Sequence, residues 1–239
     1  MAQEKETVLL KISGESLSGE GGFGYDRIAL EFIGEEIVSV SHTHRLGLVV
    51  GGGNFVRGRK IKQDVFGEDT PVPDYVGMMA TIQNAIMLQD FFERKFGLKT
   101  RVLSALEINK VCEPHIPRKV LSHLEKERIV IFAGGIGSPD FSTDTTMVLR
   151  AHEIGAKTVL KGTKVDGIYD RDPKDNPHNA KFFESITCLD YLNRKLTIVD
   201  TTAVTLAMNH GIRIRVFNFF IRGNLKRVLA EGNIGSMIH

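Results

Sequence analysis

The sequence has little of several features that mark specialised classes of protein. It contains two cysteines in 239 residues, Cys112 and Cys188, in neither CxxC nor CxxH spacing, so a disulfide framework and a zinc site both lack support. No run reaches the roughly 18 apolar residues of a membrane helix, because Lys, Gly or Asn interrupts the longest candidates. The 31 Lys+Arg nearly balance the 29 Asp+Glu. We therefore expect a small partner rather than a nucleic acid or a membrane.

Two nucleotide-binding motifs are absent or out of place. No Gly-Lys pair occurs anywhere in the chain, which excludes the GxxxxGK[ST] P-loop. A GxGxxG match exists at Gly19, Gly21 and Gly24, but it begins several residues after the first expected strand. The next expected strand ends in glycines where a dinucleotide site needs an acidic residue. A mobile glycine loop is the simpler interpretation of this match.

The remaining composition is that of an ordinary globular protein, with 42% hydrophobic and 25% charged residues. A chain of this length buries roughly 70–75% of the surface that it exposes when unfolded, so it needs no disulfide or metal to fold. Residues 1–7 are polar and no apolar h-region follows them. We expect a cytoplasmic protein with one large domain or two closely joined lobes.

Short apolar runs alternate with longer stretches of helical period, which predicts an α/β fold. Nearly continuous hydrophobic strands separated by helices indicate a mostly parallel sheet covered on both faces. The predicted strands are residues 8–13, 46–50, 100–104, 129–132, 158–161 and 213–217. The predicted helices are residues 27–41, 75–96, 117–127, 143–155, 201–211 and 224–231. Residues 170–180, rich in Pro, Asn and Asp, predict an excursion or flap.

Glycines follow three of the predicted strands at the point where each strand leads to a helix. They are Gly14, residues 51–53 and residues 134–137. In an open α/β sheet this carboxyl edge is where ligands bind, and helix N-termini there offer N–H groups to anions. Three such loops predict a ligand rich in phosphate.

Basic residues accompany the first two glycine loops. Lys11 lies within an apolar strand, where a charge is costly unless it reaches a negative group or the ligand edge. We favour a lysine that contacts phosphate, and the alternative is a lysine on an edge strand facing water. Arg57 follows Gly51-Gly52-Gly53-Asn54 at about one helical turn, where its forked donors could reach a phosphate.

The third loop runs through residues 134–144 and ends in Ser142, Thr143 and Asp144. One hydroxyl here would serve as an ordinary N-cap, and Asp144 in a first helical turn suits the helix dipole without any function. The same groups would also hold a phosphate and orient a lysine. Further along, Lys161 begins a charged, turn-rich segment that suits a nucleotide, although by itself it is equally a solvated turn.

Five motifs in this order and spacing resemble the bacterial uridylate (UMP) kinases of the amino acid kinase superfamily. The motifs are LLKISGESL, VVGGGNFVRG, DYVGMMAT, FSTD and KGTKVDGIYDRDP, and the likeness covers nearly the whole chain. The resemblance implies a three-layer αβα sandwich with a mostly parallel central sheet. The chain would form one domain over residues 1–239, with an acceptor-side lobe of about 1–157 and an ATP-side lobe of about 158–239.

The resemblance also implies the reaction and its regulation. The γ-phosphoryl of ATP would pass to UMP, giving UDP and ADP in pyrimidine biosynthesis. Mg²⁺ would be carried by the ATP phosphates without a direct protein ligand. A homohexamer activated by GTP and inhibited by UTP is expected.

Site residues carry over motif by motif. Lys11 and Lys161 would neutralise the moving phosphoryl group, and Asp144 would orient them and the metal. ATP would contact Lys11, Ile12, Ser13, Gly14, Gly53, Arg57, Thr163, Tyr169 and Asp172. UMP would contact Gly52, Asp74 (through its ribose), Ile136, Gly137, Ser138, Pro139, Asp140, Phe141, Ser142 and Thr143. The segment associated with GTP activation would be Gly19, Glu20, Gly21, Gly22, Phe23 and Gly24.

One departure concerns the acceptor loop. Where the family usually has TGNP followed by an aromatic residue, this chain has Ile136-Gly137-Ser138-Pro139-Asp140, so acceptor affinity and base choice are the least secure expectations. Two alternatives stay open: another member of the superfamily acting on a carboxylate, carbamate or phosphate, and a non-catalytic protein of the same fold that binds nucleotides or anions.

Overall fold

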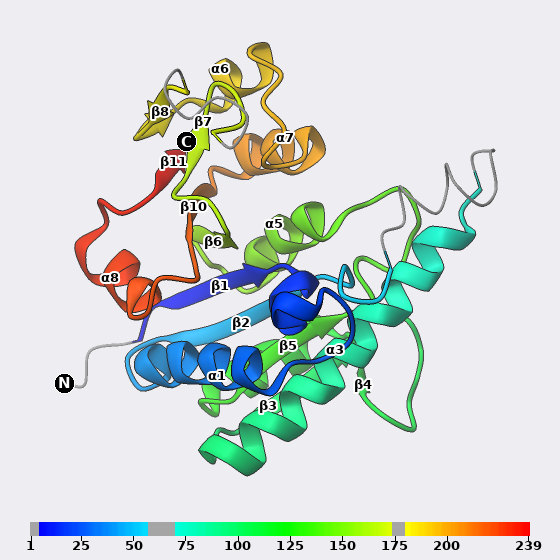
Figure 1. Cartoon of the computed structure of the whole chain (residues 1–239). Helices are drawn as coiled ribbons and strands as arrows, with labels where there is room; N and C mark the ends of the chain where they lie inside the picture. The colour runs from blue at the N-terminus through cyan, green and yellow to red at the C-terminus, as the bar shows by residue number, and fades with distance from the viewer. Residues whose placement is uncertain (1–4, 57–69, 174–179) are drawn as a thin grey trace.

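The fold is built on a nine-stranded sheet, as a computed structural model describing residues 5–56, 70–173 and 180–239 shows (Figure 1). The strand order is β4-β3-β5-β2-β1-β6-β10-β11-β9, and every pairing is parallel except β10 with β11. The strands are β1 (Thr7–Ile12), β2 (Arg45–Val50), β3 (Thr100–Ser104), β4 (Glu113–Pro114), β5 (Ile129–Ala133), β6 (Thr158–Thr163), β9 (Ser185–Ile186), β10 (Arg213–Asn218) and β11 (Ser236–Ile238). A separate antiparallel pair joins β7 (Ile168–Tyr169) to β8 (Phe182–Phe183).

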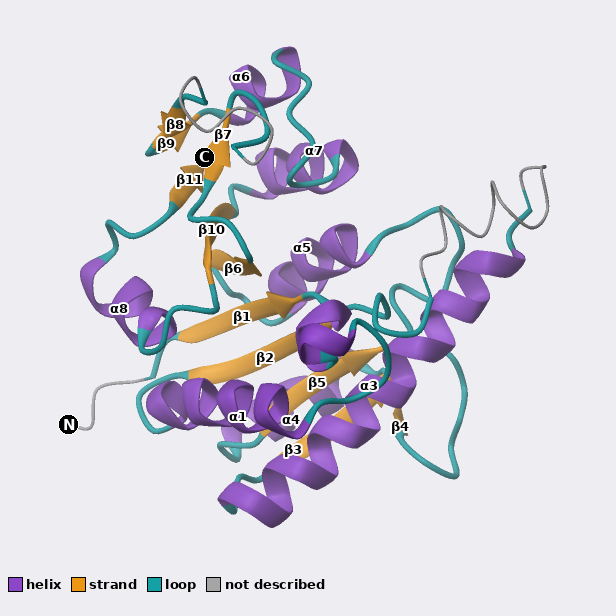
Figure 2. Cartoon of the chain, in the orientation of Figure 1, coloured by secondary structure: helices purple, strands orange, loops and turns teal. Residues whose placement is uncertain are grey.

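Helices cover both faces of this sheet (Figure 2). One face carries α1 (Arg27–Ser41), α3 (Val72–Phe96) and α8 (Asn224–Glu231). The other carries α4 (Pro117–Glu125), α5 (Thr143–Glu153), α6 (Cys188–Asn193) and α7 (Thr201–His210). Two short 3₁₀ helices, η1 (Gly14–Leu17) and η2 (Gly19–Gly21), follow β1. The predicted three-layer α/β architecture with a mostly parallel sheet is confirmed.

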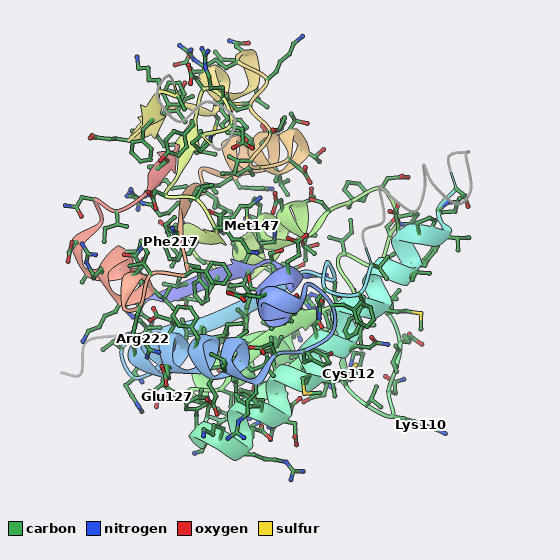
Figure 3. The ribbon with its side chains drawn as sticks, in the orientation of Figure 1. Lys110, Cys112, Glu127, Met147, Phe217 and Arg222 are labelled. Atoms are coloured by element: carbon green, nitrogen blue, oxygen red, sulfur yellow. The ribbon has the colours of Figure 1, made fainter. Side chains whose placement is uncertain are left out.

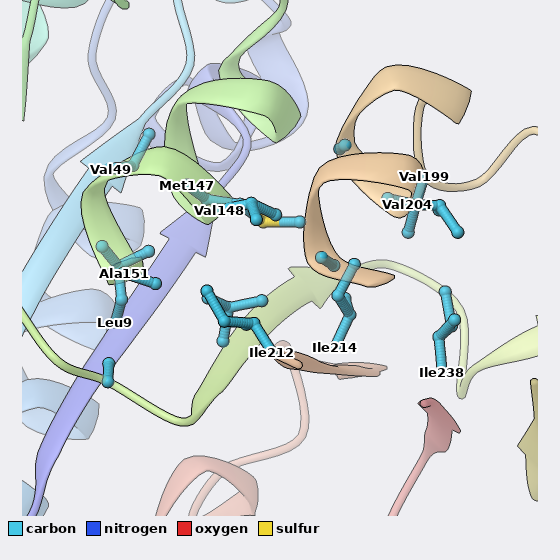
Figure 4. Packing of buried hydrophobic residues seen from close by; sticks show 14 of the residues in the cluster. Leu9, Val49, Met147, Val148, Ala151, Val199, Val204, Ile212, Ile214 and Ile238 are labelled. Carbon is cyan, nitrogen blue, oxygen red and sulfur yellow. The ribbon is translucent and has the colours of Figure 1, made fainter. Parts of the chain in front are cut away.

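Successive side chains of each strand point to opposite faces of the sheet, because a β-strand is pleated. In β1, Leu9 belongs to the cluster under α5 and α7, whereas Leu10 belongs to the cluster under α1 and α3. Figure 3 labels one further member of each cluster, Met147 and Phe217. Figure 4 shows how the first cluster joins α5 and α7 to the sheet. Odd-numbered residues of β1, Lys11 included, therefore face α5.

The six predicted strands and six predicted helices are all present, with differences of a few residues at their ends. The largest difference is at α3, which begins at Val72 instead of residue 75, because Pro73 is tolerated in a first turn, where its missing N–H has no intrahelical partner. The prediction omitted the short elements β4, β9, β11 and α6 and the β7–β8 pair. Among the described residues, no helix combines the length and apolarity needed to cross a membrane.

The position of β1 decides between the two interpretations of Lys11. β1 pairs with β2 on one side and β6 on the other, at the centre of the sheet. The alternative of an edge strand facing water is therefore wrong. Lys11 is only 9% exposed, so its charge must be compensated inside the protein.

Candidate functional site

Two buried lysines and a carboxylate meet at the carboxyl end of the central strands. In the parallel pairing of β1 and β6, Lys11 lies directly beside Lys161, so both side chains leave the same face. Asp144 lies in the first turn of α5, which packs on β1. The Lys11 Nζ is 3.0 Å from Asp144 Oδ1, and the Lys161 Nζ donates to Asp144 Oδ2. The three residues, which we call the Lys–Asp–Lys triad, are each less than 10% exposed.

Backbone groups complete the surroundings of the triad. The Ser142 hydroxyl caps α5 by accepting from the N–H groups of Asp144 at 3.1 Å and Thr145 at 3.4 Å. This cap fixes the turn that carries the carboxylate, and the helix N-terminus favours its negative charge. The Asp200 N–H donates to Asp144 Oδ2 at 3.3 Å, and the carbonyl of Ile198 accepts from Lys161.

The electrostatics of the triad leave one positive charge in excess. Burial by itself raises the pKa of the Asp144 carboxyl, but Lys11 and Lys161 together outweigh it and hold that pKa well below its ordinary value. Burial, helped by the like charge of Lys11, lowers the pKa of Lys161 to about 8 although Asp144 opposes the shift. The triad is therefore a buried cationic site that an anion such as phosphate would complete.

The first two glycine loops touch each other beside the triad. A Cβ at Gly14 would lie 2.4 Å from the Gly51 carbonyl oxygen and 2.5 Å from the Gly53 nitrogen. Gly51 in turn donates to the carbonyl of Ile12 at 3.0 Å, and the Ile12 side chain is fully buried. Glycine at position 14 is thus required by contact between the loops. The Ile12 side chain is too deeply buried to contact a ligand.

A buried amide pair holds the second loop in place. Asn54 and Asn84 exchange side-chain hydrogen bonds of 3.0 and 2.7 Å, and both are almost fully buried. Asn84 also donates to the Gly51 carbonyl at 2.7 Å, and Asn54 donates to that of Gly24 at 2.9 Å. These bonds connect α3 and residues 19–24 to the loop that follows β2.

A cavity of about 440 Å³ opens beside the triad and contains much of the expected acceptor site. Six expected acceptor residues line it, and its remaining wall comes from α3, Thr145 of α5, Val56, Gly135, and residues 200–202 ahead of and within α7. The six are Gly52, Asp74, Asp140, Phe141, Ser142 and Thr143. Ile136, Gly137, Ser138 and Pro139 lie on the same loop but outside the cavity lining, and Gly137 packs on Ala105.

The loop expected to hold the acceptor is attached to its neighbours at two points. The Asp140 N–H donates to Asp74 Oδ2 at 2.9 Å, and Asp140 has a left-handed backbone with φ of 69°. Arg150 of α5 reaches the carbonyl of Gly135 at 3.3 Å and pairs with Glu153 at 2.7 Å. The Asp140 backbone therefore orients the carboxylate expected to hold the acceptor ribose.

The residues expected to face the adenine nucleotide lie at the carboxyl edge near β6. Thr163 ends β6, and its hydroxyl donates to the carbonyl of Val165 at 2.8 Å. Tyr169 lies on β7, where its ring meets Phe182 edge to face at 5.2 Å, and Asp172 follows three residues later. Ser13, Gly14 and Gly53 belong to the glycine loops, whereas Arg57 lies outside the described residues.

The segment of residues 19–24 begins as η2 and contains left-handed glycines. Its Phe23 is 73% exposed and meets Phe55 edge to face at 5.5 Å. Gly19, Glu20 and Gly21 line a second cavity, of about 840 Å³, together with residues of α1, Lys164, Asn218 and residues 220–222. Gly22 and Gly24 lie on the same segment. Because Gly24 bonds Asn54 of the loop after β2, the segment contacts the loop that borders the 440 Å³ cavity.

Sequence reasoning missed the contribution of residues 198–200 to the triad. These residues precede α7 and follow the unpredicted α6, whose N-cap Thr187 accepts from Asp190 N–H at 3.1 Å. The pattern Thr187-x-x-Asp190 ahead of an apolar pair is the one signal for this helix in the sequence. Asn84 had no such signal, because a polar residue within a long helix usually faces water.

Comparison with known proteins supplies a family context for this geometry. The profile of the amino acid kinase family matches residues 6–218. The crystal structure of UMP kinase from Bacillus anthracis is 32% identical with a TM-score of 0.92, covering 99% of this chain and 97% of that chain. UMP kinase from Ureaplasma parvum is 33% identical with a TM-score of 0.91, covering 99% of each chain. A uridylate kinase from Archaeoglobus fulgidus, 23% identical over 98% of this chain and 100% of that chain, shares the fold with a TM-score of 0.70.

Proposed function

Because the chain belongs to the amino acid kinase family, we propose that it transfers the γ-phosphoryl of ATP to UMP, giving UDP and ADP. The observation that carries this proposal is the buried Lys–Asp–Lys triad, with its excess positive charge, next to a cavity that contains Asp74 and the acceptor loop. The identity of 32–33% to two UMP kinases over 99% of the chain supports UMP as the acceptor. The reaction would serve pyrimidine nucleotide biosynthesis in the cytoplasm.

Phosphoryl transfer requires positioning and neutralisation of charge on the transferring oxygens rather than a protein nucleophile. Lys11 and Lys161 approach from neighbouring strands, so their ammonium groups would contact the γ-phosphoryl together. Asp144 keeps both lysines at one point, and Ser142 keeps Asp144 in place. Each ammonium about 4 Å from a transferring oxygen contributes on the order of 4 kcal/mol at an effective dielectric constant of 20.

The two nucleotides would meet at the triad from opposite sides. The ATP phosphates would lie over Ser13, Gly14 and Gly53, and its adenosine would extend toward Thr163, Tyr169 and Asp172, on the ATP-side lobe of about 158–239. UMP would occupy the cavity formed by the acceptor-side lobe. There Asp74, held by the Asp140 N–H, would accept from its ribose hydroxyls.

Mg²⁺ would enter with ATP and supply further positive charge to the transferring oxygens. The donor set at the site fits this arrangement, because both oxygens of Asp144 already interact with ammonium groups, and Oδ2 also accepts from Asp200 N–H. Across the three described ranges, no group of three or more His, Cys, Asp or Glu side chains could hold a metal ion. The phosphates would therefore hold the ion.

Regulation by GTP as activator and UTP as inhibitor is part of the proposal. Residues 19–24 contact the loop after β2 through two bonds of Asn54: its side chain donates to the Gly24 carbonyl, and its own carbonyl accepts from Gly24 N–H at 3.1 Å. A ligand that ordered this segment would thereby act on the rim of the acceptor cavity. Initial rates with added GTP or UTP test this, and rates unchanged by either nucleotide would remove it.

A homohexamer is also proposed. The support is a row of exposed apolar side chains along α3. Exposure of such a face to water is unfavourable, and another copy of the chain would cover it. These side chains are Val72, Tyr75, Val76, Met79 and Met87, each at least 37% exposed. Light scattering during size exclusion measures the assembly directly, and a monomer at micromolar concentration would contradict the proposal.

A coupled assay for ADP formation with ATP, Mg²⁺ and each nucleoside monophosphate tests the central proposal. We expect turnover with UMP to exceed turnover with CMP, AMP and GMP at equal concentrations. Inactivity with UMP beside turnover of another acceptor, such as carbamate or a carboxylate, would overturn it. Calorimetric binding of ATP without turnover of any acceptor would favour the non-catalytic alternative.

A further inference from the structure

Two successive peptide groups connect residues 198–200 to the triad. The carbonyl of Ile198 accepts from the Lys161 ammonium. The N–H of Asp200 donates to Asp144 Oδ2 at 3.3 Å. A rotation of either peptide plane would remove one of these contacts, so the orientation of this segment determines part of the triad's geometry.

The hydroxyl of Tyr191, on α6, holds the opposite ends of the same two peptide groups. The N–H of Val199, which shares a peptide with the Ile198 carbonyl, donates to the Tyr191 oxygen at 2.7 Å. The carbonyl of Val199, which shares a peptide with the Asp200 N–H, accepts from the Tyr191 hydroxyl at 2.9 Å. A single oxygen therefore fixes both peptide planes, one through its lone pair and one through its proton.

The surroundings of Tyr191 make this contact rigid. Tyr191 and Val199 are both 0% exposed and lie in one hydrophobic cluster, where Figure 4 shows Val199 beside Val204. Thr187 caps the short helix that carries the tyrosine. Burial raises the pKa of the Tyr191 hydroxyl, so the hydroxyl keeps the proton that it donates. Bulk solvent does not reach these two bonds, because both residues are fully buried.

We propose that Tyr191 is a positioning residue of the phosphoryl-transfer site, whose hydroxyl holds Lys161 and Asp144 in register through the two peptide groups of residues 198–200. The reaction that it serves rests on the proposed function. A buried tyrosine that only filled the core would need any one hydrogen-bond partner. Tyr191 instead bonds both peptides whose other ends contact the triad, and bonds in such a chain polarise one another.

Tyr191→Phe tests the proposal, because it removes the oxygen and keeps the ring. We expect kcat to fall about 10- to 100-fold, as is typical when reacting groups lose their alignment, with KM for UMP and ATP within about twofold. Thr100→Val is the matched control. Its buried hydroxyl bonds Glu93 and the Gln89 carbonyl at the amino end of β3, so the control loses a buried hydroxyl away from residues 198–200.

The pH dependence of kcat separates positioning from general stability. The carbonyl of Ile198 favours the charged form of Lys161, so a loosened peptide moves the basic limb of the kcat profile to lower pH in Tyr191→Phe. The charged groups around Lys161, namely Asp144 on α5, Lys11 on β1 and Asp200 ahead of α7, remain in the variant. In Thr100→Val the limb stays where it is in the wild type.

Three results would overturn the proposal: kcat of Tyr191→Phe within twofold of the wild type, an unshifted basic limb, or an equal loss in Thr100→Val. Should Tyr191→Phe not fold, hydrogen exchange of the wild-type chain still decides, because the proposal requires the Val199 amide to be among the slowest to exchange. Fast exchange there would refute it. If the proposed function is wrong, the wild-type protein will instead be inactive with UMP. The variants are then compared with the wild type on the acceptor that does turn over.

Discussion

Lys161→Met is expected to make the protein more stable and nearly inactive. The triad contains two ammonium groups and one carboxylate, all buried, so it carries one unbalanced positive charge. Removing Lys161 leaves Lys11 and Asp144 as a balanced pair at 3.0 Å. Methionine fills a similar volume and brings no charge into the core.

The magnitude follows from the pKa of Lys161. Burial and Lys11 lower it from an ordinary 10.5 to about 8, which at 1.36 kcal/mol per pH unit means that folding disfavours the charged side chain by about 3 kcal/mol. The Ile198 carbonyl loses its donor in the variant, at a cost of about 1–3 kcal/mol. The net gain in the free energy of unfolding is then about 0–2 kcal/mol, and each kcal/mol raises Tm by about 2–4 °C.

Activity is expected to change in the opposite direction. One ammonium about 4 Å from a transferring oxygen is worth about 4 kcal/mol, so kcat should fall about 10³-fold. Asp144→Asn provides the contrast, because it removes the charge of the one carboxylate that both buried ammonium groups contact and should cost about 3–5 kcal/mol of stability. Urea unfolding and the coupled assay on both variants are the measurements. Equal destabilisation of the two variants, or more than a tenth of wild-type kcat in Lys161→Met, would refute the reasoning.

Three further predictions concern pH, packing and the acceptor loop. Because the folded pKa of Lys161 lies below its unfolded value, the unfolded chain holds an extra proton between pH 8 and 10.5. The free energy of unfolding should therefore rise with pH in this window in the wild type but not in Lys161→Met. Parallel plots of unfolding free energy against pH for the two proteins would contradict the assignment. Gly14→Ala should cost at least about 2 kcal/mol by urea unfolding, since its Cβ would lie 2.4 Å from the Gly51 oxygen; a variant as stable as the wild type would show that the two loops are not in contact. Arg150→Met should release the Gly135 carbonyl and raise KM for UMP severalfold while KM for ATP stays constant; equal changes in both constants would point to a general loss of structure.

Hydrophobic patterning predicted the layers of the fold, because the central strands are apolar on both faces and helices such as α4 and α8 are apolar on one face. The strands β1, β2 and β5 are buried along nearly their whole length, and such runs between helices specify a parallel sheet. Elements of two or three residues, such as β4 and β11, are too short to show a hydrophobic period. They form because they pair with the edge of a longer strand, as β11 pairs with β10.

Candidate site residues could be named from the sequence where one side chain carries its own chemical signal, and not where the signal lies in backbone geometry. Lys11 in an apolar strand and Asp144 after a helix cap were candidates from sequence, and the structure places both beside Lys161; their roles stay predictions. The contributions of Ile198 and Asp200 are a carbonyl and an N–H. Every residue possesses these groups, so only the folded chain shows which of them face the triad.

The glycine loops show how one sequence feature serves packing and chemistry at once. From sequence, the glycines indicate backbone that a ligand approaches closely, yet a Cβ at Gly14 would first meet Gly51 and Gly53, and one at Gly52 would meet Ala80 and the Gly77 carbonyl at 2.9 Å. The loops after β1 and β2 therefore pack on each other and on α3 without side chains between them. That contact leaves their backbone at the carboxyl edge beside Lys11, where a phosphate would find both loops and the ammonium within one site. Substituting these glycines should consequently impair folding before it impairs nucleotide binding, which separates them from Lys161, whose loss is expected to stabilise the fold.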